Sequence, residues 1–241
     1  MAANKNVVFD VVGTLVSYEY IFEAIDQRLG EKLRAEGIKP RLLGWCWLEV
    51  AEREFTYLSM SGRYAVFNKV FAGLFHRCLH YAGVAEPRSL ATEEDVAWLV
   101  AEYKKLRLRD GAAECIAKLR AAGFTVWCFT TGDAARVGGY FARGGVDMPA
   151  ENLVSCDSLG LAKPTPEAYT PILAKMSGGG GKPWFAAAHL WDASAAKTFG
   201  FKAAYCTAME GEALPDIFGE VDVVADTLPA MADKLIAASG N

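Results

Sequence analysis

The sequence lacks the features typical of nucleic-acid-binding, metal-binding and membrane proteins. Its net charge is −4, with 25 Lys and Arg against 29 Asp and Glu, so it has no basic excess to attract phosphate backbones. It has three His, and its six Cys form no Cys-x-x-Cys pair and no His spacing suited to zinc. No apolar run is long enough to span a bilayer, and no charged-then-apolar leader precedes Val7. These absences predict a cytoplasmic protein with no metal, no nucleic-acid partner and no membrane association.

Apolar residues are abundant, and their spacing predicts a parallel sheet. They make up 52% of 241 residues, which is enough to build a core and an inserted subdomain. One predicted helix has Asp110 as its N-cap and stops before Gly123, and another runs from Pro166 to about Met176. Nearly continuous apolar strands separated by helices indicate an α/β fold, a doubly wound, mainly parallel sheet covered on both faces. The predicted strands are Val7–Phe9, Phe124–Phe129, Asn152–Cys156, Trp184–His189, Phe201–Cys206 and Val221–Ala225.

The segment from about Tyr18 to Tyr103 has a different period. It has few Gly or Pro breaks and shows apolar spacing near 3.6, as in Phe67, Val70, Phe71 and Leu74. We therefore expect residues 17–104 to form a helical insertion between two parts of an α/β core, residues 1–16 and 105–241. The basic run at 104–109 that follows is predicted to be a solvated helix face.

Polar residues follow several of the predicted strands. In an open parallel sheet, ligands bind beyond the carboxyl ends of the strands. Asp10 ends the first strand, and Thr14 follows in a Gly-Thr turn. An ionised Asp can attack a carbon or phosphorus centre and form a covalent ester, and Thr14 can hold one carboxylate oxygen while the other attacks. The alternative is an Asp that only caps the turn.

The next two segments supply hydroxyls and a cation. Thr130 and Thr131 lie just before a predicted helix, where hydroxyls and backbone N–H groups suit a developing anion, although Thr-Gly-Asp is also an ordinary turn. Lys163 precedes Pro164 at the edge of an apolar run. Its ammonium group can stabilise a nucleophilic carboxylate and a negative leaving group, whereas an exposed loop Lys would have no such role.

The last segment combines an acid with an imidazole. Asp192 can orient Lys163 or activate the water that opens an ester. His189 stands three residues earlier, and its charge changes near neutral pH. We predict that Asp192 and His189 join Asp10, Thr14, Thr130 and Lys163 in catalysis, with a structural His at a strand end as the alternative.

Taken in this order, the segments resemble the haloacid dehalogenase superfamily, specifically its type II 2-haloacid dehalogenase branch. The resemblance covers nearly the whole chain and rests most closely on Lys163-Pro164 followed by Tyr169, and on Trp191-Asp192-Ala193. It implies a Rossmann-like core with a helical cap, Asp10 as nucleophile and Thr14 as its positioning partner. Thr130 takes the place of a Ser and Thr131 that of an Asn. Lys163, Tyr169 and Asp192 keep the family's identities.

Three departures from the family pattern bear on the substrate. Val12 stands where related phosphatases carry a second Asp. Trp47-Leu48 lies where the dehalogenases have a cap Arg, which leaves Arg41 or Arg53 as replacements. His189 replaces an Asn and looks like the arrangement in cis-epoxysuccinate hydrolases of the same branch. The predicted substrate-binding residues are Val11, Val12, Thr131, Tyr169, Trp191, Trp47 and Arg41.

Three functions remain open. The leading one is a metal-independent hydrolase that uses Asp10 to displace halide from, or open an epoxide at, an sp3 carbon of a small molecule. The second is a phosphatase with Mg²⁺ on Asp10 and Asp192, although it would lack both the acid at Val12 and a second acid at Ala196. The third is a binding or biosynthetic role that reuses the pocket. No cofactor is expected for the leading function, and the resemblance allows a homodimer.

Overall fold

The computed structural model describes residues 4–240, and the chain divides into two compact units. The first unit is Met1–Ser17 with Leu108–Asn241, and the second is Tyr18–Arg107. The first is the α/β core and the second the helical insertion, so the α/β fold class is confirmed.

Within residues 4–240 the core holds a six-stranded sheet. Its order is β5-β4-β1-β6-β7-β8, and all neighbouring strands pair in parallel. Val7, Val8 and Phe9 of β1 are completely buried, as expected of a central strand covered on both faces. Two short strands, β2 (Val16–Ser17) and β3 (Arg107–Leu108), form a separate small sheet. The six strands are β1 (Asn6–Asp10), β4 (Thr125–Thr130), β5 (Leu153–Ser155), β6 (Trp184–Ala187), β7 (Lys202–Cys206) and β8 (Val223–Ala225).

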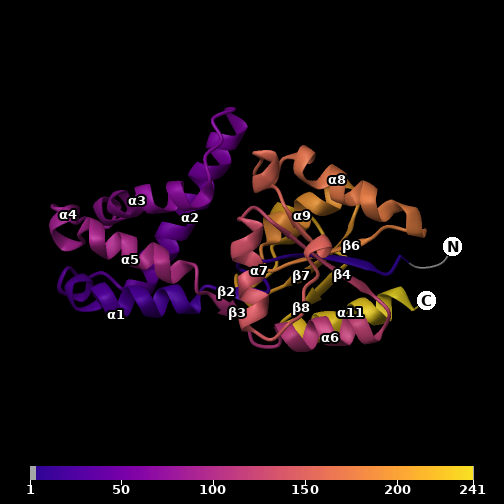
Figure 1. Ribbon diagram of the computed structural model, residues 1–241. Coiled ribbons are helices and arrows are strands. Elements are labelled where there is room, and N and C mark those ends of the chain that lie inside the picture. The colour runs from indigo at the N-terminus through magenta and orange to yellow at the C-terminus, as the bar shows by residue number, and fades with distance from the viewer. Residues whose placement is uncertain (1–3, 241) are drawn as a thin grey trace. The chain divides into compact units, whose positions relative to one another are not determined.

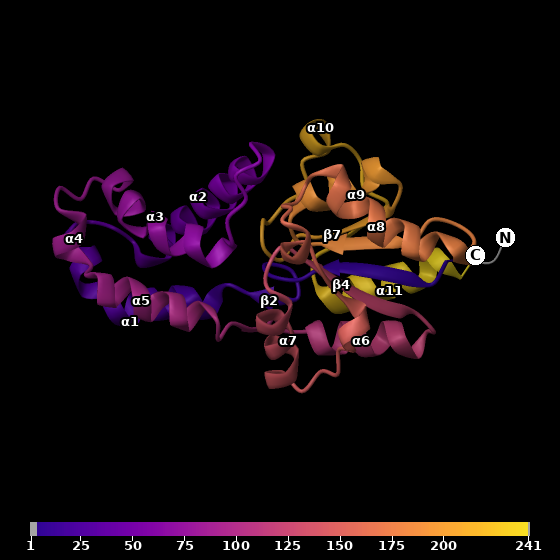
Figure 2. The same ribbon diagram turned by 45° about the horizontal axis from the view of Figure 1, so that its top comes forward.

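Helices cover both faces of this sheet (Figures 1 and 2). On one face α6 (Ala112–Ala121) and α11 (Leu228–Ser239) lie side by side, and on the other α8 (Pro166–Met176) packs against α9 (Leu190–Phe199). The helix α7 (Ala134–Arg143) follows β4 and contacts β5, and the short α10 (Pro215–Phe218) contacts α9.

Several predicted boundaries are wrong, and the strand expected to begin at Val221 begins at Val223. The N-cap of α6 is Gly111, not Asp110, because the chain enters this helix through a left-handed residue with φ +79°. The expected strand Trp184–His189 ends at Ala187, and His189 instead caps α9. The strand therefore stops early enough for His189 to turn out of the sheet.

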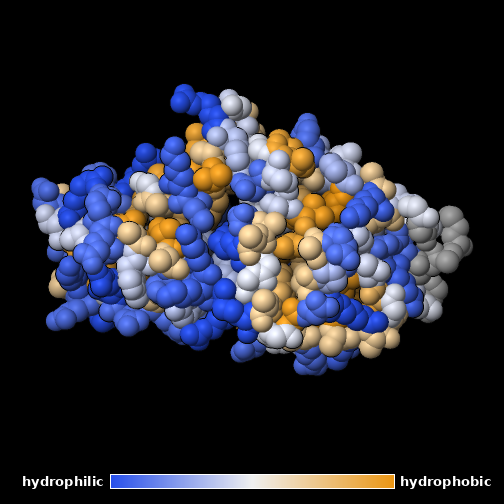
Figure 3. All heavy atoms as spheres, viewed as in Figure 1, coloured by the Kyte–Doolittle hydropathy of each residue, from blue (hydrophilic) through white to orange (hydrophobic). Residues whose placement is uncertain are grey.

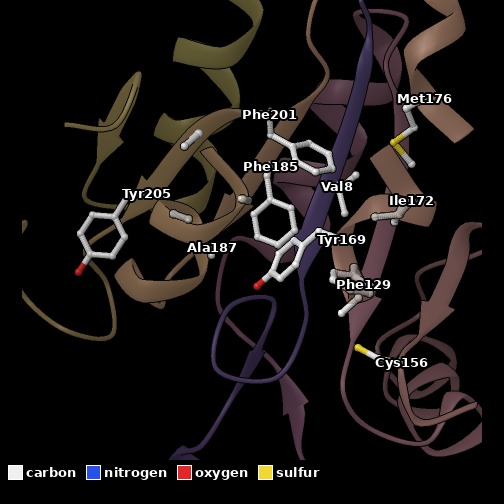
Figure 4. Packing of buried hydrophobic residues seen from close by; sticks show 14 of the residues in the cluster. Val8, Phe129, Cys156, Tyr169, Ile172, Met176, Phe185, Ala187, Phe201 and Tyr205 are labelled. Atoms are coloured by element: carbon white, nitrogen blue, oxygen red, sulfur yellow. The ribbon is translucent and has the colours of Figure 1, made fainter. Parts of the chain in front are cut away.

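An aromatic cluster packs between the sheet and the helices α8 and α9 (Figure 4). Tyr169 lies next to Phe129 and Phe185, with ring centroids 5.3 and 5.8 Å away, and Phe185 contacts Phe201 at 5.6 Å. All four side chains are at most 1% exposed. This packing gives the carboxyl ends of β4 and β6 a rigid apolar support.

The order in which the chain adds strands to the sheet reverses at β1. It places β4 and β5 on one side of β1 and then returns to add β6, β7 and β8 on the other. Such a switch in strand order leaves a crevice beyond the carboxyl ends of the central strands. Residues that follow β1, β4 and β6 are therefore placed to form a site.

The second unit is helical, as its sequence period predicted. It comprises α1 (Glu19–Ala35), α2 (Pro40–Met60), α3 (Phe67–Tyr81), α4 (Pro87–Leu90) and α5 (Glu93–Tyr103). None of the described helices combines the length and apolar composition needed to cross a bilayer. On the face shown in Figure 3, hydrophilic residues alternate with small apolar patches.

Candidate active site

Asp10 is the centre of the site. It is the last residue of β1 and is 7% exposed. Thr14 Oγ1 donates a hydrogen bond to Asp10 Oδ2 at 2.6 Å, and the Ala188 amide donates to Thr14 Oγ1 at 2.8 Å. Gly13, with φ +94°, makes the turn between them in a conformation that glycine adopts readily. Since Thr14 accepts from Ala188, its single proton is directed to Asp10.

Lys163 joins two carboxylates. It lies in the loop between β5 and α8, and its Nζ donates to Asp10 Oδ1 at 3.0 Å and to Asp192 Oδ2 at 2.7 Å. Its side chain is 2% exposed, and Nζ lies 4.7 Å from the ring centroid of Phe129 and 5.5 Å from that of Phe185. The aromatic cluster thus forms the floor beneath a buried ammonium group.

Asp192 is bound on both of its oxygens. It lies in the first turn of α9 and is 0% exposed. Lys163 occupies Oδ2, and the Tyr169 hydroxyl donates to Oδ1. Because neither oxygen faces solvent, this geometry favours the orienting role for Asp192 over water activation.

The buried charges shift one another's pKa values. Burial alone would raise the pKa of Asp10, but the Lys163 charge and the His189 contact hold it well below the usual range. Burial would lower the pKa of Lys163, but Asp10 and Asp192 together raise it above its ordinary value. Burial and the Asp10 charge raise the pKa of Asp192 despite Lys163. At neutral pH, Asp10 is therefore an ionised carboxylate beside a charged Lys163.

His189 reaches Asp10 from the start of α9. It is 5% exposed, and its Nδ1 lies 3.0 Å from Asp10 Oδ2. The ring lies so close to Gly13 that a Cβ there would come within 2.2 Å of its Cε1. Trp191, half-buried, has its ring 5.7 Å from that of His189. Gly13 is thus required for close approach of the imidazole as well as for its positive φ.

The remaining core residues predicted for catalysis or substrate binding lie along the same edge. Val11 is buried and Val12 half-buried in the turn after β1. Thr130 ends β4, is 3% exposed, and its Oγ1 accepts the Gly132 amide at 3.0 Å. Thr131 is half-buried next to it. Since Asp10 is in register with Phe129, these hydroxyls follow directly beside the nucleophile.

The structure corrects the predicted role of Trp47. Its side chain is completely buried within the helical unit, stacked on Phe71 with centroids 3.6 Å apart. Its Nε1 donates to the Phe71 carbonyl at 2.7 Å. Trp47 is therefore a core residue of that unit, since helical spacing alone does not tell a buried aromatic from a pocket aromatic.

The two arginines considered as replacements for the cap Arg bind carboxylates of their own unit. Arg41 pairs with Glu19 and lies 4.8 Å from the ring centroid of Phe22. Arg53 Nη2 lies 3.3 Å from Glu54. The role of Arg41 in substrate binding stays a prediction.

Arg109 was missed by the sequence analysis. The expected solvated helix face at 104–109 is wrong, because α5 ends at Tyr103 and this segment includes β3. Arg109 is half-buried and donates from Nη2 to the Gly13 carbonyl at 2.6 Å and from Nε to the Thr14 carbonyl at 2.9 Å. It fixes the turn that carries Thr14. The only sequence signal is its place where the chain returns to the core.

The phosphatase alternative requires a site for Mg²⁺. Asp10 and Asp192 are the acids that would hold it, and the Lys163 ammonium lies between them with a bond to each. Within residues 4–240, no group of three or more His, Cys, Asp or Glu could hold a metal ion. The carboxylates present therefore fit an ammonium partner better than a divalent ion.

Comparisons with known proteins bear on the family of this chain. The profile of the haloacid dehalogenase-like hydrolases matches residues 5–200. An (S)-2-haloacid dehalogenase of Pseudomonas putida is 23% identical over 235 residues, 96% of each chain. An (S)-2-haloacid dehalogenase 2 of Pseudomonas sp. (strain CBS-3) is 24% identical over 200 residues, 82% of this chain and 81% of its own.

Solved structures share the fold across the whole chain. The L-2-haloacid dehalogenase of Xanthobacter autotrophicus with chloropropionic acid covalently bound superposes with a TM-score of 0.72 at 20% identity, covering 98% of both chains. A putative HAD-hydrolase of Bacillus subtilis bound to magnesium gives 0.66 at 15% identity, covering 100% of both. The fold is thus shared with both kinds of relative, while the profile match over most of the chain decides the family. This protein belongs to the haloacid dehalogenase-like hydrolases.

Proposed function

We propose that this enzyme hydrolyses a small 2-haloacid through a covalent ester on Asp10. The observation that carries the proposal is the unequal binding of the two carboxylate oxygens. Oδ2 contacts both Thr14 and His189, whereas Oδ1 contacts Lys163. Val12 stands where a phosphatase would need its general acid. The curated relatives that support the substrate class are named (S)-2-haloacid dehalogenases.

The first step is a displacement at carbon. Oδ1 of Asp10, which has fewer hydrogen-bond donors, attacks the carbon that bears the halogen. The O–C bond forms as the C–X bond breaks, and the halide leaves with the bonding electron pair. The low pKa of Asp10 keeps it ionised for this attack, and covalent catalysis divides the hydrolysis into two easier steps.

The second step releases the product. Water attacks Cγ of the ester, and the negative charge develops on Oδ2, which Thr14 and His189 are placed to stabilise by hydrogen bonds. His189 accepts the water proton at Nε2, since Nδ1 faces Asp10. The Cγ–Oδ1 bond then breaks and Lys163, next to Oδ1, supplies a proton to the departing alkoxide. The product keeps Oδ1, and Asp10 keeps one oxygen from water.

The test of this function is halide release from the two enantiomers of 2-chloropropionate, followed together with formation of lactate. We expect equal amounts of chloride and lactate from one enantiomer. Robust release of phosphate from p-nitrophenyl phosphate with no chloride from either enantiomer would reverse the assignment.

His189→Ala should slow ester hydrolysis more than ester formation. The imidazole is the group placed to accept the water proton, and loss of a general base typically costs about 10²–10⁴-fold in rate. Rapid quenching and mass measurement of the intact enzyme should show the ester accumulating. His80→Ala, on the exposed end of α3, is the matched control and should behave as the wild type. Equal slowing of both steps would contradict the assignment of His189.

Chelation should leave the activity unchanged. Lys163 supplies the positive charge between Asp10 and Asp192, so turnover should be the same with excess EDTA as with added Mg²⁺. The measurement is the chloride release rate after dialysis against EDTA. If the chloride release rate falls tenfold or more, which corresponds to about 1.4 kcal/mol, and Mg²⁺ restores it, the result would point to the phosphatase-type metal site.

Epoxide opening is a second candidate function, favoured by the contact of His189 with Asp10. The same Asp10 attack would open the ring, and His189 could relay a proton to the ring oxygen. Incubation with cis-epoxysuccinate and with 2-chloropropionate separates the two, because tartrate forms only in the first case.

A cytoplasmic location and a homodimer complete the proposal. All six cysteines are free thiols, and five of them are buried, which is typical of a reducing compartment. The dimer is a prediction that sedimentation velocity would test.

A further inference from the structure

The three central charges leave an anionic substrate without a cation of its own. Lys163 donates to both Asp10 and Asp192, so one ammonium is shared by two carboxylates. With both carboxylates ionised, the three groups carry a net charge of −1. A 2-haloacid carries its carboxylate on the carbon that Asp10 attacks. The substrate carboxylate and the Asp10 carboxylate therefore come close together, and like charges repel strongly in a buried site. A second cation near Asp10 would offset this repulsion.

Arg136 is a cation close to the carboxyl end of β4. It belongs to the first turn of α7, directly after β4, and its amide donates to the N-cap Asp133 at 2.7 Å. A Cβ at Gly132 would meet Arg136 Nη2 at 2.1 Å, Cζ at 3.2 Å and Thr130 Oγ1 at 3.4 Å. The guanidinium thus lies against the Gly132 backbone, on the same side as the Thr130 hydroxyl. Glycine at 132 leaves the space that the guanidinium fills.

Tyr140 holds this guanidinium in place. Arg136 Nη1 donates to the Tyr140 hydroxyl at 2.7 Å, and Cζ lies 5.6 Å from the ring centroid. Tyr140 is completely buried, so it is a fixed support. A guanidinium carries five N–H donors in a planar fork that matches a carboxylate, and Tyr140 accepts one of them.

Thr130 provides a second donor at the same place. Its Oγ1 accepts the Gly132 amide, so its own proton is available to donate. Thr130 follows Phe129, which is in register with Asp10 on the neighbouring strand. A carboxylate bound by Thr130 and Arg136 would therefore hold its α-carbon on the side of the sheet edge where Asp10 attacks.

We infer that Arg136, with Thr130, binds the carboxylate of the substrate. The inference rests on the proposed function and deepens it, because it selects 2-haloacids over neutral alkyl halides. It also places the anion-binding cation on the α/β core, in a chain that has Trp47-Leu48 where the family's cap Arg would be.

The test compares an anionic and a neutral substrate of the same shape. Arg136→Met should lower kcat/KM for 2-chloropropionate by about 10- to 100-fold, mainly through KM, and leave the rate with 2-chloropropionamide unchanged. The kcat/KM of Arg136→Lys should lie between those of the wild type and Arg136→Met, because Lys keeps the charge but not the planar fork of donors. Arg143→Met is the matched control, since Arg143 lies on the same helix and over the same Tyr140 ring but about two turns further from Gly132 than Arg136. Equal losses for both substrates would overturn the inference.

Binding of propionate separates this inference from the proposed function. Propionate has the carboxylate but no leaving group, so calorimetry measures its affinity even if the enzyme does not turn over 2-chloropropionate. We expect wild type and Arg143→Met to bind propionate equally and Arg136→Met to bind it at least tenfold more weakly. Equal affinity in all three proteins would refute the role of Arg136, whatever the outcome of the chloride assay.

Discussion

Asp10→Asn should abolish turnover while the protein remains folded. An amide is not nucleophilic enough to form the ester, so we expect kcat to fall by on the order of 10⁴-fold or more, as when other catalytic nucleophiles are removed. Asn is isosteric with Asp and can still accept the Thr14 hydrogen bond, so the turn after β1 should persist. The measurement is chloride release, with circular dichroism to check the fold. Asp216→Asn, on the exposed α10, is the control and should retain full activity.

Heavy-oxygen water identifies the bond that is broken. In a single turnover in H₂¹⁸O with excess wild-type enzyme, the label should appear in the peptide that contains Asp10, and the lactate should remain unlabelled. This follows because the product takes Oδ1 from Asp10 and water replaces it. Labelled lactate with an unlabelled Asp10 would show that water attacks the substrate directly, and the covalent route would then be wrong.

The proximity of the central residues could be predicted from the sequence because of the strand topology. Asp10 and Thr130 end parallel strands, and His189 follows a third, so a parallel sheet brings them to one edge whatever the side-chain details. Lys163 and Asp192 could be placed there by their spacing from these strands. The direction of each hydrogen bond could not, since it depends on the packing of Tyr169 and Phe185 beneath the ammonium group.

Three residue roles could not be predicted from the sequence, because they depend on the direction of a side chain or on the space that a glycine leaves. Trp47 and a pocket aromatic have the same helical spacing, and only the stacking on Phe71 decides between them. Arg109 looks like part of a solvated basic run until its bonds to the Gly13 and Thr14 carbonyls are seen. Arg136 depends on the space at Gly132, which no local pattern signals.

Lys163→Met should destabilise the protein as well as inactivate it. The side chains of Asp10 and Asp192 are 10% and 0% exposed, and Lys163 is the ammonium between them. Removing one partner of a buried ion pair leaves uncompensated charge and costs about 3–5 kcal/mol. Urea unfolding at pH 7.5 would measure the loss. Lys175→Met, an exposed Lys on α8 that lies over Trp127, is the control and should change stability by less than about 1 kcal/mol.

The pH dependence of this loss distinguishes buried charge from lost packing. In the wild type the lowered pKa of Asp10 contributes stability that is present above the ordinary carboxyl value of about 3.9 and is lost as the pH falls through the folded value. Without Lys163, burial raises the pKa of Asp10, so its ionised form opposes folding and protonation relieves it. Burial raises the pKa of Asp192 even in the wild type. The informative quantity is therefore the difference in unfolding free energy between Lys163→Met and the wild type at each pH. Lys163→Met should therefore recover stability relative to the wild type between pH 8 and pH 5. Adding Asp192→Asn to this variant should recover part of the stability at pH 7.5 without restoring chloride release. If the stability deficit of Lys163→Met does not change with pH, the ammonium group acts mainly through its packing on Phe129.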